Sequence, residues 1–521
     1  MIKTGNSRSG DPILYVNGRS IHSKYNPVKE ADNFIKTQFY SKQINRFILI
    51  GPGIGYLKKS LKRMFPNAKL LSLHMDIKIL QNTFKIDKDW TYGDKTNLKK
   101  LLYDFIPDFL LSTTSLLNWL PCTECFPDRL VEIEKTIQQF FLERKGTLFT
   151  IAGFGRKWFS NIYNNYVFNN NIYEIINITS PVFIAASGPS LKESFHFLKK
   201  NSNKIILAAL PSSLRALKSV SIIPDFVIHT DPGFWAKEHL KYLPDKKIPI
   251  IMPLTSAFIP ESGNPIILLN QGSEIEKYFL SNNTIKINSH GTVAGSAYLF
   301  FRKITNSPII FLGLDFSFSD IREHVSPHSF DIIYTCKQNR MNGYLNLLYN
   351  KRQNHFELSV KNKTTTAFST YAGWFNTERE LVNTFRYKSS NIKTKSLKDI
   401  NLDDIKKIIC KVNKNDIIMK KSDKQDIKDR LKSFHFFLNY ILNLLEQYHK
   451  NINTLNSMEI LELFSKQSLL LEIFQYCSYV DILKLSKIYT TDLYKSKEIL
   501  NNIYINSKDF IKQFQKRLNY E

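Results

Sequence analysis

The sequence predicts an α/β protein with a Rossmann-like amino-terminal domain, a central doubly wound and mostly parallel sheet, and a carboxy-terminal helical domain. Three patterns predict it. A β-branched run meets a glycine-rich loop at about residue 50, short apolar runs alternate with helical patterns after about residue 180, and long amphipathic patterns follow about residue 430. A chain of 521 residues is also too long for one ordinary core, so about two to four domains are expected.

The amino-terminal domain, residues 1–175, contains an apolar run at Phe47–Ile50, the loop "GPGIG", an amphipathic helix and a second strand at Lys69–Leu73. This pattern is typical of the first βαβ unit of a Rossmann-like domain. In a dinucleotide or methyl-donor site, an acid at the end of the second strand binds ribose hydroxyls, and the nearest candidate is Asp76, beside His74. The loop spacing is G-x-G-x-G rather than G-x-G-x-x-G. A domain kept for architecture or for a partner is therefore favoured over a cofactor site.

The rest of this domain is predicted to be helical, because apolar residues recur at helical intervals in segments such as "LVEIEKTIQQFFLERKG". In the central domain, residues 176–345, short apolar runs alternate with helical patterns, which favours a parallel sheet covered on both faces. The strand candidates are Val182–Ala186, Lys204–Leu210, Phe226–Thr230, Ile248–Leu254, Pro265–Leu269 and Pro308–Leu312.

Two regions follow the central domain. Residues 346–400 are polar and lysine-rich, and are expected to form a connecting region packed on the central domain. Residues 401–521 are expected to form the helical domain, because they carry two long amphipathic patterns whose apolar faces fit a helix-bundle core. The first of these faces consists of Phe434, Phe437, Leu438, Ile441, Leu444, Leu445 and Tyr448.

Composition limits the function classes. The net charge of +26 raises the question of nucleic acid, but the lysines are spread along the chain, as on solvated faces, so nucleic acid is not expected as a partner. Part of the charge can attract an anionic substrate or an acidic protein. The start of the chain lacks the apolar segment of a secretory signal, and no stretch is apolar enough to span a membrane, so a cytoplasmic protein is expected. Only Cys122 and Cys125 of the five cysteines are close in sequence, and no metal site is expected.

The segment "PVFIAASGPSLKES" ends a predicted buried strand on small residues. Ligands of open parallel sheets bind outside the carboxyl ends of the strands. At such an end, Gly188 lets the backbone approach a phosphate, Pro189 fixes the turn, and Ser190 can cap the next helix while neighbouring N–H groups face the anion. Two companion segments, "PDFVIHTDPGF" and "SHGTVAGSAYLFFRKITNSPIIFLGLDFSFSD", should bring further polar strand ends to the same edge.

These residues resemble a known family. "ASGPSLKES", "PDFVIHTDPG", "HGTVAGSA" and "PIIFLGLDFSFSD" are similar, in order and spacing, to the central domain of the motility-associated factor glycosyltransferases, and the resemblance covers about residues 14–390. Members of this family modify flagellin with nonulosonic acids such as pseudaminic and legionaminic acid, supplied as CMP derivatives. The central domain is in turn similar to bacterial sialyltransferases.

The resemblance implies a site for a CMP-nonulosonic acid donor with no further cofactor. Gly188, Pro189 and Ser190 match the phosphate-side loop, although Ser187 stands where the sialyltransferases have Asn or Gly. Asp231 replaces an Asn, and Val293 lacks the hydroxyl of a Ser. "YKSSNIKTKSLKDI" replaces a glycine-rich stretch. The donor-binding candidates are Ser187, Gly188, Pro189, Ser190, Thr230, Asp231, Gly291, Thr292, Gly313, Leu314 and Asp315.

The expected reaction is inverting transfer of the sugar to Ser or Thr hydroxyls of flagellin, which needs a base. Histidine suits this role because its ordinary pKa lies near working pH. His324 is the first choice and His328 the second, while His229 and His290 border the strand-end clusters and are expected to help binding. The carboxy-terminal helices are expected to hold flagellin or its export chaperone.

Further side chains and other functions stay open. Arg322 and Lys192 can counter the sugar carboxylate or the phosphate, and "TYAGWF" at residues 370–375 can wall the acceptor side. One alternative is an enzyme similar to archaeal 6-hydroxymethylpterin diphosphokinases, which use ATP and Mg²⁺. The other is a basic scaffold without catalysis that binds nucleic acid or flagellar proteins.

Overall fold

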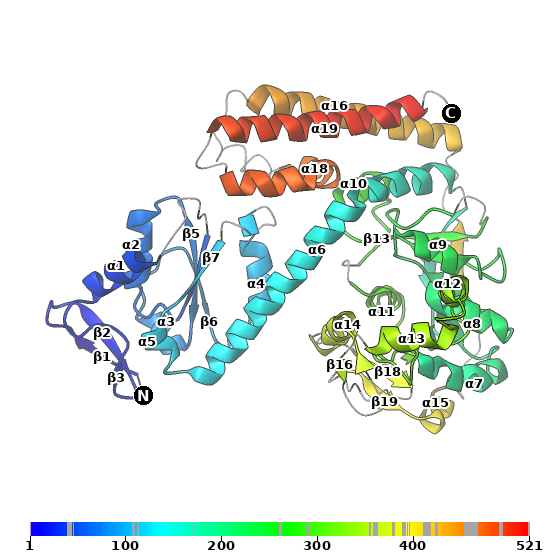
Figure 1. Ribbon diagram of the computed structural model, residues 1–521, viewed down its shortest axis with the longest axis horizontal. Helices are drawn as coiled ribbons and strands as arrows, with labels where there is room; N and C mark the ends of the chain where they lie inside the picture. The colour runs from blue at the N-terminus through cyan, green and yellow to red at the C-terminus, as the bar shows by residue number, and fades with distance from the viewer. Residues whose placement is uncertain are drawn as a thin grey trace. The chain divides into compact units, whose positions relative to one another are not determined.

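The computed structural model describes most of the chain, namely residues 2–38, 44, 46–106, 110–111, 114–169, 171–259, 263–287, 291–353, 356–357, 363–377, 381–387, 392, 394, 396–409, 418–421, 426–452, 467–488 and 493–518. The chain divides into two compact units, one of residues 1–155 with 439–521 and one of residues 156–438. Helix α6 (Pro127–Phe168) crosses the first boundary and α16 (Ile427–Ile452) crosses the second (Figure 1). The finer division into four regions stays a prediction.

The first unit contains a four-stranded parallel sheet with the order β6-β5-β4-β7, formed by β4 (Arg46–Ile50), β5 (Lys69–His74), β6 (Lys88–Thr91) and β7 (Thr114–Asn118). The first strand in sequence is central, as in half of a Rossmann sheet. The predicted βαβ unit is confirmed. Strand β7 was expected to be helical; its sequence "TSLLN" forms a strand because it pairs along the whole of β4.

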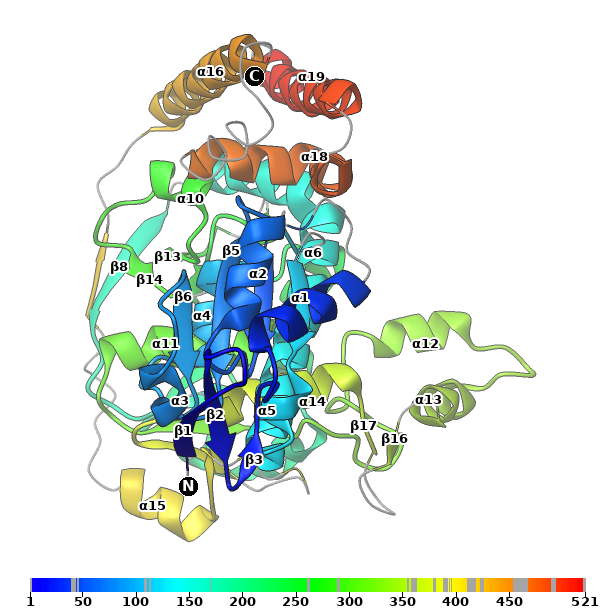
Figure 2. The ribbon, with the colours of Figure 1, turned by 90° about the vertical axis from the view of Figure 1, so that its left-hand side faces the viewer.

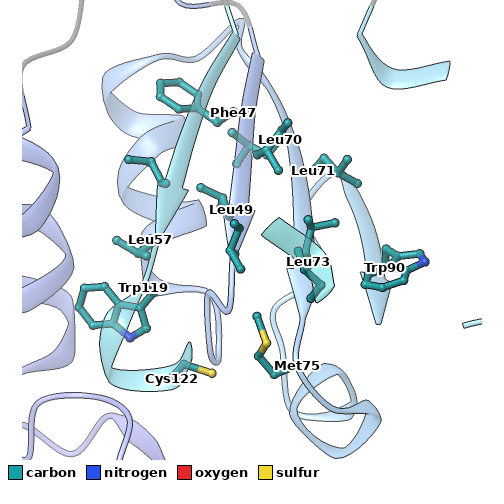
Figure 3. Close-up of a cluster of buried hydrophobic side chains, with 14 of the residues drawn as sticks. Phe47, Leu49, Leu57, Leu70, Leu71, Leu73, Met75, Trp90, Trp119 and Cys122 are labelled. Carbon is teal, nitrogen blue, oxygen red and sulfur yellow. The ribbon is translucent and has the colours of Figure 1, made fainter. Parts of the chain in front are cut away.

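Helices cover this sheet. They are α1 (Pro27–Thr37), α2 (Tyr56–Met64), α3 (Ile77–Gln81), α4 (Leu98–Phe105) and α5 (Leu120–Thr123). Figure 3 shows part of the apolar core of this unit, which includes Leu49 of β4, Leu73 of β5, Leu57 of α2 and Trp119. An antiparallel meander precedes it, formed by β1 (Ile2–Asn6), β2 (Pro12–Val16) and β3 (Arg19–Ser20).

The carboxy-terminal helices are α16, α18 (Ser468–Ile488) and α19 (Leu493–Leu518). Of the predicted apolar face of α16, Leu444 is half-buried and the other six side chains are buried, so the apolar face is confirmed. The Tyr448 ring packs on Phe474 of α18, as expected for a helix bundle, whereas the Phe434 and Phe437 rings pack on Phe279 of the second unit. Helix α18 packs along α19, and Gln515 of α19 donates to Asn439 of α16 at 2.7 Å. Within the described part of the chain, no helix combines the length and apolarity needed to cross a membrane.

The second unit is built on a large sheet. All six predicted strands are confirmed: β9 (Val182–Ala185), β10 (Ile206–Ala209), β11 (Phe226–Ile228), β12 (Ile250–Met252), β13 (Ile266–Asn270) and β15 (Ile309–Leu312). Strand residues alternate between two cores: Val182 and Ile184 face one, and Phe183 and Ala185 face the other. Because both faces are covered, the strands are apolar throughout, as parallel sheets require.

Other strands extend this sheet. Its order over the described residues is β19-β18-β15-β9-β10-β11-β12-β13-β8-β20, with β14 (Ile285–Lys286) pairing β13. The additions are β8 (Ile172–Asn177), β18 (Thr384–Tyr387), β19 (Lys398–Ile400) and β20 (Ile418–Lys421), and every pairing is parallel except β20 with β8. Residues 346–400, which were expected to form a connecting region packed on the central domain, thus contribute two strands, β18 and β19, to the sheet.

Short helices cover the sheet: α7 (Phe195–Lys200), α8 (Leu214–Ser219), α9 (Phe234–Leu240), α10 (Glu274–Phe279), α11 (Val293–Ile304), α14 (Thr366–Thr377) and α15 (Leu402–Ile409). Two further helices, α12 (Asp331–Lys337) and α13 (Tyr344–Gln353), form a hairpin that stands out from the sheet (Figure 2). A small hairpin, β16 (Phe356–Glu357) and β17 (Lys363–Thr364), lies between α13 and α14 in sequence.

Candidate functional site

The strand order reverses next to β9. The chain moves from β9 through β10 to β13 in one direction, whereas β15 and β18 lie on the other side of β9. Ligands of open α/β sheets bind outside the carboxyl ends of the strands at such a reversal. The loops that follow β9 and β15, which carry Ser187–Ser190 and Gly313–Asp315, therefore lie where a ligand is expected.

The two loops are joined by backbone and side-chain hydrogen bonds. Gly188 donates its N–H to the carbonyl of Gly313 at 2.7 Å. The backbone N–H of Ser190 donates to Asp315 Oδ2 at 2.7 Å, and its hydroxyl donates to Oδ1 at 2.5 Å. The N–H of Ser190 is thus engaged by a carboxylate rather than facing an anion, and Pro189–Ser194 is a 3₁₀ helix without a side-chain cap. The capping role expected for Ser190 is wrong.

Close approach of these loops explains the two glycines. A Cβ on Gly188 would lie 2.5 Å from both Asp315 Oδ2 and the Gly313 carbonyl oxygen. Gly313 has φ of +65°, and a Cβ there would lie 2.7 Å from Leu191 Cβ. Phe316 also has positive φ, +56°, which is rare for a bulky residue and occurs at functional sites. The glycines let two loops meet, so their role is not limited to admitting a ligand.

Asp315 is buried, and burial raises the pKa of its carboxyl group. The two hydrogen bonds from Ser190 and the positive charge of Arg386 act in the opposite direction and lower this pKa, but burial is the larger effect. Arg386 of β18 is fully buried, pairs with Asp399 at 2.7 Å and donates to the carbonyl of Leu314 at 3.2 Å. Sequence reasoning missed Arg386 because it lies in a polar stretch without a motif. It fixes the backbone beside Asp315.

The strand β11 brings Thr230 and Asp231 to the same edge of the sheet, two strands away from β9. Asp231 is exposed, accepts from the N–H of Gly233 at 2.6 Å through Oδ1, and accepts from the N–H of Ala257 at 3.0 Å through its carbonyl. The preceding His229 is fully buried with Nε2 3.2 Å from the Ala257 carbonyl oxygen. His229 is therefore a core residue and does not border open space.

Gly291 and Thr292 precede α11, and Thr292 is its N-cap residue without a side-chain cap bond. The helix α14, which contains "TYAGWF", lies against them: a Cβ on Gly291 would lie 3.7 Å from Tyr371, and one on Gly295 would lie 3.0 Å from Trp374. Burial raises the pKa of the Tyr371 hydroxyl, and the negative charge of Asp231 raises it further. Tyr371 thus lies near both Asp231, which follows β11, and Gly291, which precedes α11. His290 lies outside the described residues.

The two candidate bases lie together. The rings of His324 and His328 stack at 4.3 Å with an interplanar angle of 19°. His324 Nδ1 lies 3.2 Å from Ser187 Oγ, and the Ser187 carbonyl accepts from Val325 N–H at 2.8 Å. Burial lowers the pKa of His324, so its imidazole is neutral near pH 7 and can accept a proton. The loop after β9 and the first candidate base are therefore in direct contact.

His328 is buried more deeply, with Nε2 without a hydrogen-bond partner among the described residues. Burial, followed by the neighbouring His324 and His239, lowers its pKa. Its backbone carbonyl accepts from Arg215 at 2.6 Å and its Nδ1 accepts from Phe330 N–H at 3.2 Å. The His328 ring packs against the His324 ring, so His324 is the better placed of the two candidate bases.

Both histidines line a small pocket that is open to solvent. Its walls carry charges: Glu323 forms an ion pair with Lys351 and lies 3.6 Å from His324 Nε2, and Arg322, a candidate from the sequence, pairs with Asp331 at 3.2 Å. The sequence did not single out Glu323, Asp331 or Lys351, because none belongs to a motif and only the fold brings them together. Lys192, by contrast, is exposed.

In the first unit, His22 of the same chain occupies the space beside the glycine loop. Ile54 donates its N–H to His22 Nε2 at 3.0 Å, and a Cβ on Gly53, whose φ is +61°, would overlap the His22 ring. Asp76 caps α3 and pairs with Arg129 at 3.0 Å, and His74 Nε2 lies 2.9 Å from Asp89 Oδ1. The groups that would bind a dinucleotide are used internally, which agrees with an architectural role.

The cysteines are consistent with structural roles. Cys122 is fully buried, and burial raises its pKa to about 12, so it remains a thiol. Cys122 and Cys125 are free. Within the ranges that the structure describes, no group of three or more His, Cys, Asp and Glu side chains is arranged to hold a metal ion.

Comparison with known proteins supports the fold. A family model described as 6-hydroxymethylpterin diphosphokinase MptE-like matches residues 156–321. An uncharacterized protein of Treponema pallidum (strain Nichols) is 26% identical over 261 residues, which are 49% of this chain and 58% of that relative. The chain thus spans little more than half the length of the curated relative that it matches.

A solved structure is similar over the whole chain. The Maf glycosyltransferase from Magnetospirillum magneticum AMB-1 superposes with a TM-score of 0.61 at 11% sequence identity, covering 100% of this chain and 92% of that one. This likeness confirms the fold that the sequence resemblance implied, including the mostly parallel central sheet and the helical carboxy-terminal region. The chain has the fold of a Maf glycosyltransferase.

Proposed function

We propose that this protein is a glycosyltransferase that moves a nonulosonic acid from a CMP-activated donor to Ser or Thr hydroxyls of flagellin in the cytoplasm. The observation that carries the proposal is the contact between Ser187 and His324: it joins the loop at the strand-order reversal to a pocket that contains a neutral imidazole. The fold match over the whole chain supports the same class of enzyme.

In this proposal the donor lies across the carboxyl ends of β9, β11 and β15. The exposed Asp231 carboxylate accepts a hydrogen bond from a ribose hydroxyl or from the cytosine amine. The joined loops, held by Ser190 and Asp315, fix the phosphate-side backbone. CMP is a good leaving group, so the protein contributes orientation and electrostatic support and needs no further cofactor.

His324 acts as the base. With Nδ1–H donating to Ser187 Oγ, Nε2 carries the lone pair and faces Glu323 in the pocket. An acceptor hydroxyl placed near Nε2 loses its proton to the imidazole as its oxygen attacks the sugar, and the C–O bond to the phosphate breaks. The nearby Glu323 carboxylate stabilises the imidazolium that forms.

The direct test is the mass of flagellin co-expressed with this protein and a CMP-nonulosonic acid pathway. We expect flagellin to gain the mass of one or more nine-carbon acidic sugars. The Gly188→Trp variant, whose side chain has no room beside Asp315, should abolish the gain, and the Gly343→Trp variant, at a glycine with open space around it, should keep it. Unmodified flagellin with the wild-type protein contradicts the proposal.

A pterin diphosphokinase is the second candidate, because the MptE-like family model covers the loops after β9, β11 and β15. The two candidates differ in the nucleotide they bind. We expect CMP to raise the thermal midpoint of unfolding, since a ligand that binds only the folded state stabilises it. A rise with ATP and Mg²⁺ and none with CMP favours the diphosphokinase instead.

A further inference from the structure

The outer wall of the pocket is a helical hairpin. Asp331 and Tyr334 of α12 and Leu348 and Lys351 of α13 line the pocket opposite His324. Arg322 ties the hairpin to the preceding loop, because its guanidinium reaches both Asp331 and the hydroxyl of Tyr344. The hairpin is therefore fixed beside the candidate base, although Figure 2 shows that it stands out from the central sheet.

The pocket and the expected donor site are adjacent spaces. None of the eleven donor-binding candidates lines the pocket, whereas both candidate bases do. His324 stands between them, with Nδ1 toward Ser187 and Nε2 toward Glu323. A base in a transfer reaction lies between donor and acceptor, so the pocket is on the acceptor side of His324.

An exposed apolar row lies on the hairpin. Leu345 and Tyr349 of α13 are 62% and 49% exposed, Met341 in the turn before α13 is 84% exposed, and Ile332 of α12 is 46% exposed. Leu345 and Tyr349 share one face of α13, because they are four residues apart. Exposed apolar side chains gathered beside a pocket mark a binding surface more often than isolated ones do.

The charge of the same surface indicates what binds there. The acids Glu323 and Asp331 are engaged by Lys351 and Arg322. No ion pair is formed within the described ranges by the hairpin cations Lys337, Arg340 and Arg352. The surface is thus apolar and basic, which complements a segment with apolar and acidic side chains.

We propose that this pocket and the row Ile332, Met341, Leu345 and Tyr349 form the acceptor subsite, and that its occupant is an extended polypeptide segment that places a Ser or Thr hydroxyl near His324. The inference rests on the proposed function and adds the place and chemistry of acceptor recognition. The segment carries an apolar side chain against the row and acidic side chains toward Lys337 and Arg340. A membrane fits less well, because three cations are fewer than the roughly four to eight of a typical lipid-binding basic cluster.

The test uses the full chain, purified flagellin and CMP-pseudaminic or CMP-legionaminic acid. Leu345→Asp removes apolar surface, and Asp is favourable in the first turn of α13, so the fold is retained. We expect the KM for flagellin to rise roughly tenfold, the effect of losing one good interface contact, while the KM for the donor changes by less than about twofold. Ile223→Asp is the control, because Ile223 is 60% exposed and precedes the amino end of β11.

Charge reversal gives an independent measurement. Arg340→Glu should raise the KM for flagellin severalfold at low salt and lose most of this effect at high salt, because exposed charges are screened. Equal KM values for flagellin in the Leu345→Asp and Ile223→Asp proteins overturn the subsite. Binding of the wild-type protein to phosphatidylserine vesicles that Leu345→Asp abolishes overturns the polypeptide occupant.

Failure of the proposed function gives a different result. If the wild-type protein releases no CMP from either donor, the transferase proposal fails, but binding of labelled flagellin by anisotropy still tests the surface. Weaker flagellin binding by Leu345→Asp than by Ile223→Asp then supports the docking surface, and equal binding overturns it.

Discussion

Ser190 and Asp315, 125 residues apart in sequence, form a paired hydrogen bond at the point where the strand order reverses. Both oxygens of the buried carboxylate accept from one residue, its N–H at 2.7 Å and its hydroxyl at 2.5 Å. This pair fixes the distance between the loops after β9 and β15. The shape of the expected donor site therefore depends on a contact within the protein.

Removing the hydroxyl should weaken the fold. Ser190→Ala removes a hydrogen bond to a buried carboxylate, and we expect the free energy of unfolding to fall by about 2 kcal/mol. Ser219→Ala, which removes a hydrogen bond to the carbonyl of Ala216 in its own helix, is the control and should cost about 1 kcal/mol or less. Urea unfolding measures both. Equal losses in the two variants would contradict a special role for the pair.

Adding one methyl group at Gly188 should be more damaging. The new Cβ meets an Asp315 oxygen and the Gly313 carbonyl at 2.5 Å, and neither can move without breaking the paired loops. We expect Gly188→Ala to lower the free energy of unfolding by about 3 kcal/mol, as overpacking does. Gly343→Ala, with nothing within 4 Å, should leave the thermal midpoint near that of the wild type.

The sequence predicted the interior of the second unit's sheet but not its edges. Strands such as β9 and β15 are apolar on both faces, because helices cover both, and this makes them easy to recognise. Strands β18 and β19, "TFRY" and "KDI", are short and carry charge, and only pairing with β15 and with each other makes them strands. Tertiary context decided their structure.

The candidate site was predicted only in part, again because tertiary context decides some of its structure. The loops at Ser187 and Gly313 follow recognisable strands, so their meeting could be expected from parallel topology. The pocket wall could not, because Glu323, Asp331 and Lys351 come from a loop and a helical hairpin with no motif. The use of His22 to fill the glycine loop had no signal either, since it depends on how the amino-terminal meander packs.

Acid should destabilise the protein through its buried histidines. Burial lowers the pKa of His229 to about 4, against an ordinary value of 6.5. The unfolded chain therefore binds the proton first, and this contribution to stability is complete above pH 6.5 and is lost as the pH falls through 4. The shift corresponds to roughly 3 kcal/mol. The free energy of unfolding, measured with urea between these pH values, should fall accordingly.

The contribution of His229 can be isolated by substitution. His229→Gln keeps a donor for the Ala257 carbonyl but does not titrate, so the loss of stability between pH 6.5 and 4 should shrink by roughly 3 kcal/mol. His196→Gln, at an exposed position, is the control for replacing a histidine by glutamine. If the free energy of unfolding of the His229→Gln variant depends on pH as in the wild type, His229 is not kept buried in solution.

The filled glycine loop predicts both a stability loss and an absence of binding. His22→Phe keeps an aromatic ring, slightly larger than imidazole, but leaves the N–H of Ile54 without its acceptor, which should cost about 1 to 3 kcal/mol. Neither NAD nor S-adenosylmethionine should raise the thermal midpoint of the wild-type protein. A rise with either ligand would mean that His22 leaves the loop and that the first unit binds a nucleotide.

The ion pair of Arg386 and Asp399 should respond asymmetrically to substitution. Arg386 is fully buried, whereas the Asp399 side chain is 34% exposed, so Asp399→Asn leaves a buried cation without its counter-charge while Arg386→Met leaves a carboxylate that water can reach. We expect Asp399→Asn to lower the free energy of unfolding by about 3 to 5 kcal/mol and Arg386→Met by less. The double variant should be more stable than Asp399→Asn, because the unpaired cation is gone. Urea unfolding of the three variants measures this double-mutant cycle. If the free energy of unfolding of the double variant is equal to or lower than that of Asp399→Asn, Arg386 stabilises the fold mainly through its hydrogen bond to the Leu314 carbonyl.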